Sequence, residues 1–74
     1  MSFAKLRGKI KEVFGSQGRF AEAMGMNAST LSAKLNGKSE WTRQEIETAC
    51  RLLNIPAVEV SDYFFIVKVG KTLL

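Results

Sequence analysis

The sequence predicts a small all-α domain of five short helices, followed by an extended C-terminal segment. Apolar residues recur at helical spacing in several separate stretches, and residues that cap or end helices stand between these stretches. A β-branched and aromatic run with no helical period comes only near the C-terminus. The chain of 74 residues is long enough for one hydrophobic core.

The first two predicted helices end at glycines. Ser2 can cap the first helix, which ends at Gly15. The apolar side of this helix carries Phe3, Leu6, Ile10, Val13 and Phe14. Ser16 can cap the second helix, which ends at Gly25, and Gly18 inside it costs up to about 1 kcal/mol relative to alanine. The inner side of the second helix carries Phe20, Ala21 and Met24.

The third and fourth helices have clear start signals. Asn27 can cap a helix that runs to about Leu35, and Asn36-Gly37 can end it because both residues tolerate a left-handed backbone. Thr42 and Glu45 have the spacing of a capping box, which starts the fourth helix. The inner face of this fourth helix carries Ile46, Ala49, Cys50 and Leu53.

The last part of the chain changes character. Pro56 suits the first turn of a short fifth helix, for which Asn54 is a candidate cap. The residues expected to point inward from it are Val58 and either Tyr63 or Phe64. Residues 64–69 are β-branched and aromatic and end at Gly70, so they are expected to form a strand or an extended arm. We therefore divide the chain into a helical domain over residues 1–64 and a C-terminal arm over residues 65–74.

Basic residues predominate in the first two thirds of the chain. The net charge is +4 and the pI is about 9.6. Residues 1–43 contain eight basic and three acidic residues, whereas residues 44–74 contain three and four. Anionic partners such as nucleic acid or a membrane surface are therefore plausible, and a surface for a polyanion is expected within residues 1–43.

The composition argues against a metal site, a disulfide or an enzyme. Cys50 is the single cysteine and there is no histidine, so the ligand set of a structural zinc site is absent. Glu12 and Glu22 have no partner at catalytic spacing, and no cofactor motif is found. The lone thiol, the lack of an apolar run of about 18 residues and the lack of a signal peptide predict a soluble cytoplasmic protein.

The second and third predicted helices match the geometry of a helix-turn-helix, because only residues 25–27 separate them. The run QGRFAEAMGMNASTLSAKLNGK, residues 17–38, resembles the helix-turn-helix of Cro and repressor proteins of temperate phages, the lambda-repressor-like family. The residues that carry the resemblance are Gln17, Ala21, Gly25, Leu31 and the closing Asn36, Gly37 and Lys38. The similarity covers about residues 3–64. The chain departs from the family pattern at Gly18, where a better helix former is expected, and at Lys34, where the family usually has an apolar residue.

The resemblance implies a sequence-specific transcriptional regulator, such as a repressor, that binds double-stranded DNA at a palindromic operator. Residues 28–35 would lie in the major groove, and the side chains expected to read bases are Ala28, Ser29, Thr30, Ser32 and Ala33. Their small size lets the helix backbone sit deep in the groove, where thymine methyls, water and DNA deformability would give specificity. The side chains expected to contact phosphates are Gln17, Arg19, Lys34, Asn36, Lys38 and Arg43.

Two alternatives stay open from the residues alone. The small polar face of residues 28–35 could be an ordinary solvated helix surface, or the domain could be a protein-interaction module such as an antitoxin or antirepressor.

In the C-terminal arm, Phe65, Val67 and Val69 alternate with the period of a strand. We expect them to pair with the same segment of a second chain in a homodimer, with folding back onto the same domain as the alternative.

Overall fold

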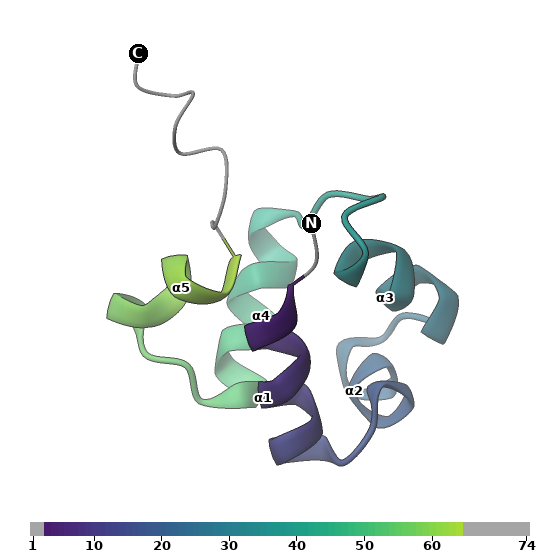
Figure 1. Cartoon of the computed structure of the whole chain (residues 1–74), viewed down its shortest axis with the longest axis horizontal. Coiled ribbons are helices and arrows are strands. Elements are labelled where there is room, and N and C mark those ends of the chain that lie inside the picture. The colour runs from purple at the N-terminus through teal and green to yellow at the C-terminus, as the bar shows by residue number, and fades with distance from the viewer. Residues whose placement is uncertain (1–2, 65–74) are drawn as a thin grey trace.

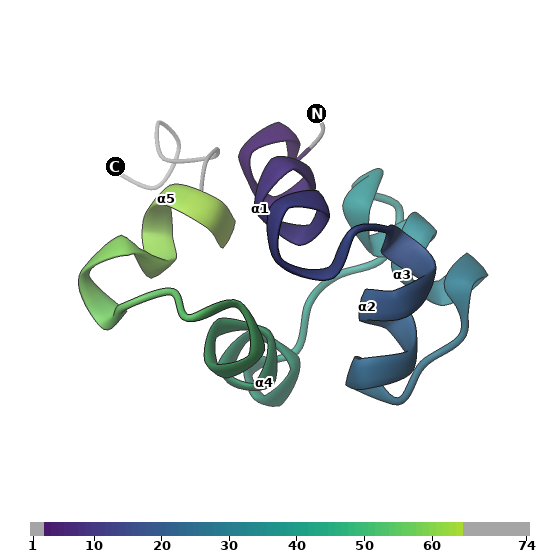
Figure 2. The same ribbon diagram turned by 90° about the horizontal axis from the view of Figure 1, so that it is seen from below.

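The computed structural model describes residues 3–64, which form five α-helices and one 3₁₀ turn. The elements are α1 (Ala4–Phe14), α2 (Gln17–Met24), α3 (Ala28–Leu35), α4 (Arg43–Leu53), η1 (Ala57–Glu59) and α5 (Val60–Phe64). In two perpendicular views, α1 and α4 lie in the middle, α2 and α3 lie on one side, and α5 lies on the other (Figures 1 and 2). The prediction of an all-α fold with five helices is confirmed, and residues 3–64 contain no strand.

The predicted caps account for where α2, α3 and α4 begin. Ser16 Oγ accepts a hydrogen bond from Arg19 N, and Asn27 Oδ1 accepts one from Thr30 N. The capping box of α4 is complete, because Thr42 Oγ1 accepts from Glu45 N and Glu45 Oε1 accepts from Thr42 N. These bonds satisfy backbone donors that a helix start leaves without partners.

Glycines in the left-handed region end the first two helices. Gly15 has φ 86° and Gly25 has φ 78°, conformations that an L side chain rarely adopts. Asn54 has φ 57° and closes α4, which corrects the expectation that it caps the next helix. Its short polar side chain tolerates the left-handed backbone, so it acts as a helix stop.

The hydrophobic core draws on all five helices. Its fully buried large side chains are Leu6, Ile10, Phe20, Leu31, Leu35 and Leu53. Two predicted core residues are in fact exposed, Val13 by 42% and Val58 by 83%. Val13 lies at the margin of the face that Leu6 and Ile10 define. Val58 lies in the 3₁₀ turn η1, which has about three residues per turn, so the α-helical period does not apply to it.

Tyr63 and Phe64 are both buried, and Phe64 is the last residue of α5. The expectation that the extended segment starts at Phe64 is therefore wrong, because this side chain packs into the helical core. Trp41, in the loop before α4, packs edge-on against Phe3 and Phe64, with ring centroids 6.3 and 5.1 Å away. Aromatic contacts thus join the start of α1, the loop and α5.

No helix in the described part of the chain is long and apolar enough to cross a membrane.

Candidate functional site

The outward side of α3 is the face that the sequence assigns to base reading. Leu31 and Leu35 point into the core, and Phe20 and Ala21 of α2 are buried in the same cluster. Of the five predicted reading residues, Ala28, Ser29 and Thr30 are exposed, whereas Ser32 and Ala33 are half-buried. The face therefore presents short side chains that allow another molecule to approach the helix backbone closely.

Two hydroxyls at the start of α3 are tied to the helix cap. Asn27 Oδ1 accepts from Thr30 Oγ1 at 2.9 Å and from Ser29 Oγ at 3.3 Å, in addition to Thr30 N. Because both hydroxyls donate to this one oxygen, their lone pairs are left to accept hydrogen bonds. On DNA, such acceptors match the exocyclic amino groups of adenine and cytosine.

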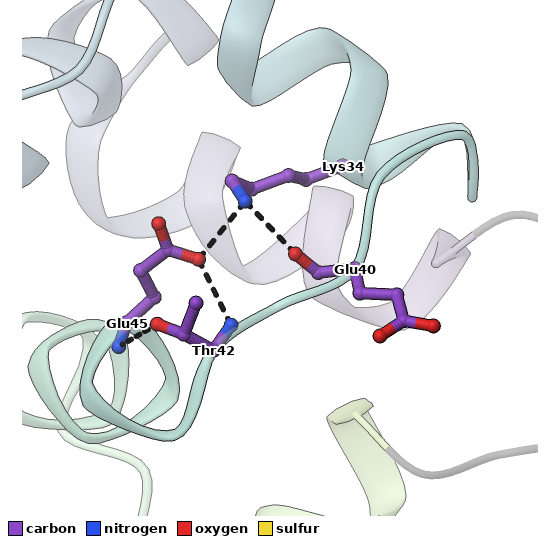
Figure 3. Close-up of polar contacts among 4 residues, drawn as sticks. All are labelled: Lys34, Glu40, Thr42 and Glu45. Carbon is purple, nitrogen blue, oxygen red and sulfur yellow. Dashed lines mark hydrogen bonds and ion pairs between the residues drawn. The ribbon is translucent and has the colours of Figure 1, made fainter.

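The ammonium of Lys34 is sheltered inside the domain, although the sequence predicts that it reaches outward to a phosphate. Its residue is only 7% exposed, and Nζ lies 3.0 Å from Glu45 Oε1 and donates to Glu40 O at 2.9 Å (Figure 3). The ammonium therefore points toward the start of α4 and away from solvent. This corrects the expectation of a phosphate contact, since a buried ammonium stays with its carboxylate partner.

The carboxylate of Glu45 serves two donors in this cluster. The hydrogen bond from Thr42 N lowers the pKa of Glu45 most, burial opposes this, and Lys34 lowers the pKa further. Glu45 therefore stays ionised at neutral pH, as both the capping box and the ion pair require.

Arg7 is a site residue that sequence reasoning missed. Its guanidinium donates to Asn36 Oδ1 at 2.6 Å and to Leu35 O at 3.2 Å, so α1 holds the end of α3. Asn36 is exposed, and only its Oδ1 is engaged by Arg7. Its amide N–H₂ group can still donate to a phosphate, so the predicted phosphate contact of Asn36 stays a prediction. No spacing in the sequence relates two residues that lie 29 positions apart.

The other predicted phosphate contacts differ in their surroundings. Gln17 is half-buried at the start of α2 and lines an open hollow together with Arg7 and Lys11. Arg19 and Lys38 are exposed. Arg43 pairs with Glu47 at 3.3 Å, but the two side chains are 90% and 67% exposed, so solvent screens the pair and a polyanion can compete with it.

The predicted dimerisation residues Phe65, Val67 and Val69 lie outside the described residues, as does the whole predicted arm of residues 65–74.

The sequence matches, over residues 1–66, the family model described as "Protein of unknown function (DUF739)". Curated proteins gave no match. Among solved structures, the chain is similar to the modulator of repression (MOR) of the temperate bacteriophage TP901-1 from Lactococcus lactis. The two share 40% sequence identity with a TM-score of 0.78, and the match covers 88% of each chain. This chain is thus related to a phage regulatory protein, and it belongs to the DUF739 family.

Proposed function

We propose that this protein is a phage regulator that modulates repression, and that it does so by binding double-stranded DNA through α3. The first part rests on the name of its structural relative, a modulator of repression, at 40% identity over most of both chains. The second part rests on the resemblance of residues 17–38 to a Cro and repressor helix-turn-helix. The proposed activity is binding without catalysis, and we place it in the cytoplasm.

The observation that carries the DNA proposal is the exposure of a short-side-chain α3 within a chain of net charge +4. In the proposed complex, α3 enters the major groove and Ala33 and Ser29 face base edges. Lys38 and Arg43, which follow α3 in the chain, place positive charge near the phosphate backbone of the DNA. Gln17 and the free N–H groups at the start of α2 offer a further phosphate contact.

Selection of binding sites from a random duplex pool tests this proposal. We expect a palindromic consensus, and binding that a polyanion competes away. Ala33→Gln should change the selected sequence, because it places a long amide on the reading face. Ala57→Gln is the matched control, since Ala57 is exposed in η1, the turn directly before α5. Figure 1 shows α5 on the opposite side of α1 from α3. The proposed recognition face would be wrong if Ala33→Gln left both affinity and consensus unchanged.

A second candidate function is binding to a protein, with the DNA-binding repressor of the same phage as the expected partner. The observation in its favour is the chemistry of α3: the ammonium of Lys34 is turned inward, and the hydroxyls of Ser29 and Thr30 donate to the Asn27 cap. A small, nearly neutral face of this kind suits close packing against another protein. Under this mechanism, Ala33→Gln would weaken repressor binding, and no duplex would be selected from the pool.

We also propose that the protein acts as a homodimer through Phe65, Val67 and Val69. A single helix-turn-helix reads one half of a palindrome, and a second copy supplies the other half. Deleting residues 65–74 should give a folded monomer with weakened binding to a full palindrome and nearly unchanged binding to a half-site. Sedimentation that shows a monomeric full-length chain well above micromolar concentration would contradict the dimer.

A further inference from the structure

The ion pair between α3 and α4 has no direct role in the proposed function, yet it joins the two elements that the function uses. Lys34 extends from the last turn of α3, and its ammonium contacts the backbone oxygen of Glu40 in the loop and the carboxylate of Glu45 in α4 (Figure 3). The same carboxylate accepts from the backbone N–H of Thr42. One charged group thus contacts the loop and the helix that follows it.

Helix α3 packs mainly against one other helix, α2, and α2 in turn packs on α1 and α4. Polar side chains supply specific ties from the end of α3 to the rest of the domain: Arg7 from α1, and the pair of Lys34 with Glu45 from α4. The orientation of the end of α3 therefore depends on these ties as well as on apolar contacts.

The burial of the pair points to a role in geometry. The side chains of Lys34 and Glu45 are only 9% and 27% exposed. Removing two charges from water costs much of the energy that their attraction returns, so such a pair adds little net stability. It does favour one arrangement, because any displacement of α3 relative to α4 would leave a sheltered ammonium without its partner.

We propose that Lys34 is a positioning residue that holds the end of α3 and the loop of residues 36–42 in register with the start of α4. As a result, the reading face of α3 and the cations Lys38 and Arg43 form one surface of fixed shape. The effect on binding rests on the proposed function. The effect on the loop is independent of any ligand.

Four variants of the full chain separate positioning from stability and from direct contact. Lys34→Met keeps the apolar stem and removes the ammonium. Glu45→Gln removes the charge but keeps a capping-box acceptor for Thr42 N. The double variant Lys34→Met with Glu45→Gln leaves no unpaired buried charge. Lys38→Met is the control for a lysine that is exposed and assigned to phosphate.

The readouts are the melting temperature, the affinity for a selected duplex across a range of salt concentrations, and residue-resolved amide hydrogen exchange. Lys34→Met should lower the melting temperature, and the double variant should recover most of that loss. In the double variant, amides of residues 36–42 should still exchange at least about tenfold faster than in the original chain, because loss of a charged hydrogen bond has about this effect. Duplex affinity should remain lowered by a similar factor, with an unchanged salt slope.

Three results would overturn the proposal. Recovery of affinity together with melting temperature in the double variant would mean that Lys34 only stabilises the fold. Lys38→Met should decrease the slope of log affinity against log salt concentration by about 0.9. The same decrease in Lys34→Met would mean that Lys34 contacts phosphate directly. Unchanged exchange in the double variant would mean that the pair does not hold the loop. If the original chain binds no duplex, the DNA proposal fails, and the exchange measurement alone decides the positioning role.

Discussion

Substituting alanine for Gly8 and for Gly25 should change stability in opposite directions. A Cβ added at either position meets no atom within 4 Å, so steric crowding is the same in the two cases. The backbone differs: Gly8 lies inside α1 without a positive φ, whereas Gly25 ends α2 with φ 78°. The comparison therefore isolates the conformational preference of the chain from packing.

The magnitudes follow from that difference. Glycine inside a helix costs about 1 kcal/mol relative to alanine, so Gly8→Ala should raise the free energy of unfolding by about that amount. An alanine in the left-handed region costs about 1–2 kcal/mol, so Gly25→Ala should lower it correspondingly. The two variants should differ by roughly 2–3 kcal/mol, and a domain of this size shifts its melting temperature by about 4–8 °C per kcal/mol.

Urea unfolding followed by circular dichroism measures both free energies, and a thermal melt checks their order. The slope of the unfolding free energy against urea concentration should be the same in the original chain and in the two glycine variants, so that their urea midpoints report stability directly. The reasoning would be refuted by a Gly25→Ala variant as stable as Gly8→Ala, because the backbone at Gly25 would then impose no cost on a side chain.

Three further predictions concern charge and reactivity. Lys38→Ala should weaken binding to all duplexes alike and reduce the slope of log affinity against log salt by about 0.9, a change measurable by fluorescence anisotropy. The pKa of Glu45 is lowered on folding, so its stabilising contribution is present above its unfolded pKa and is lost as pH falls through the folded value. Urea unfolding should show this loss below about pH 4.5, and Glu45→Gln should reduce it. Burial raises the pKa of the Cys50 thiol, so iodoacetamide should react more slowly with the folded chain than with the chain in urea; equal rates would contradict this.

Local signals in the sequence predicted the helices well because their causes are local. Ser16, Asn27 and Thr42 each bond a backbone N–H within three residues, and a left-handed glycine at Gly15 or Gly25 needs no distant partner. Helical periodicity likewise identified most of the core. It failed at Val58, where the backbone leaves the α-helical period in the 3₁₀ turn, and at Val13, which is exposed although it lies inside α1.

The candidate site was predicted less completely, because its polar contacts join residues that are distant in the sequence. The family resemblance was needed to assign the short side chains of α3 to a reading face, and of these Ala28, Ser29 and Thr30 are exposed whereas Ser32 and Ala33 are half-buried. The occupation of Asn36 by Arg7 could not be anticipated, since it depends on how α1 crosses the end of α3.

Lys34 shows where helical geometry stops being informative. The period of a helix gives the direction in which a Cβ leaves the backbone, but the lysine stem lets the ammonium reach either solvent or a sheltered partner. The partner was already visible in the sequence, because Glu45 was identified as half of a capping box. Its carboxylate can accept more hydrogen bonds than the one from Thr42 N, and that spare capacity suits a nearby lysine at the end of the preceding helix. A lysine at a position where an apolar residue is expected, followed by a capping-box glutamate at the next helix start, is therefore better interpreted as a buried pair than as a free cation.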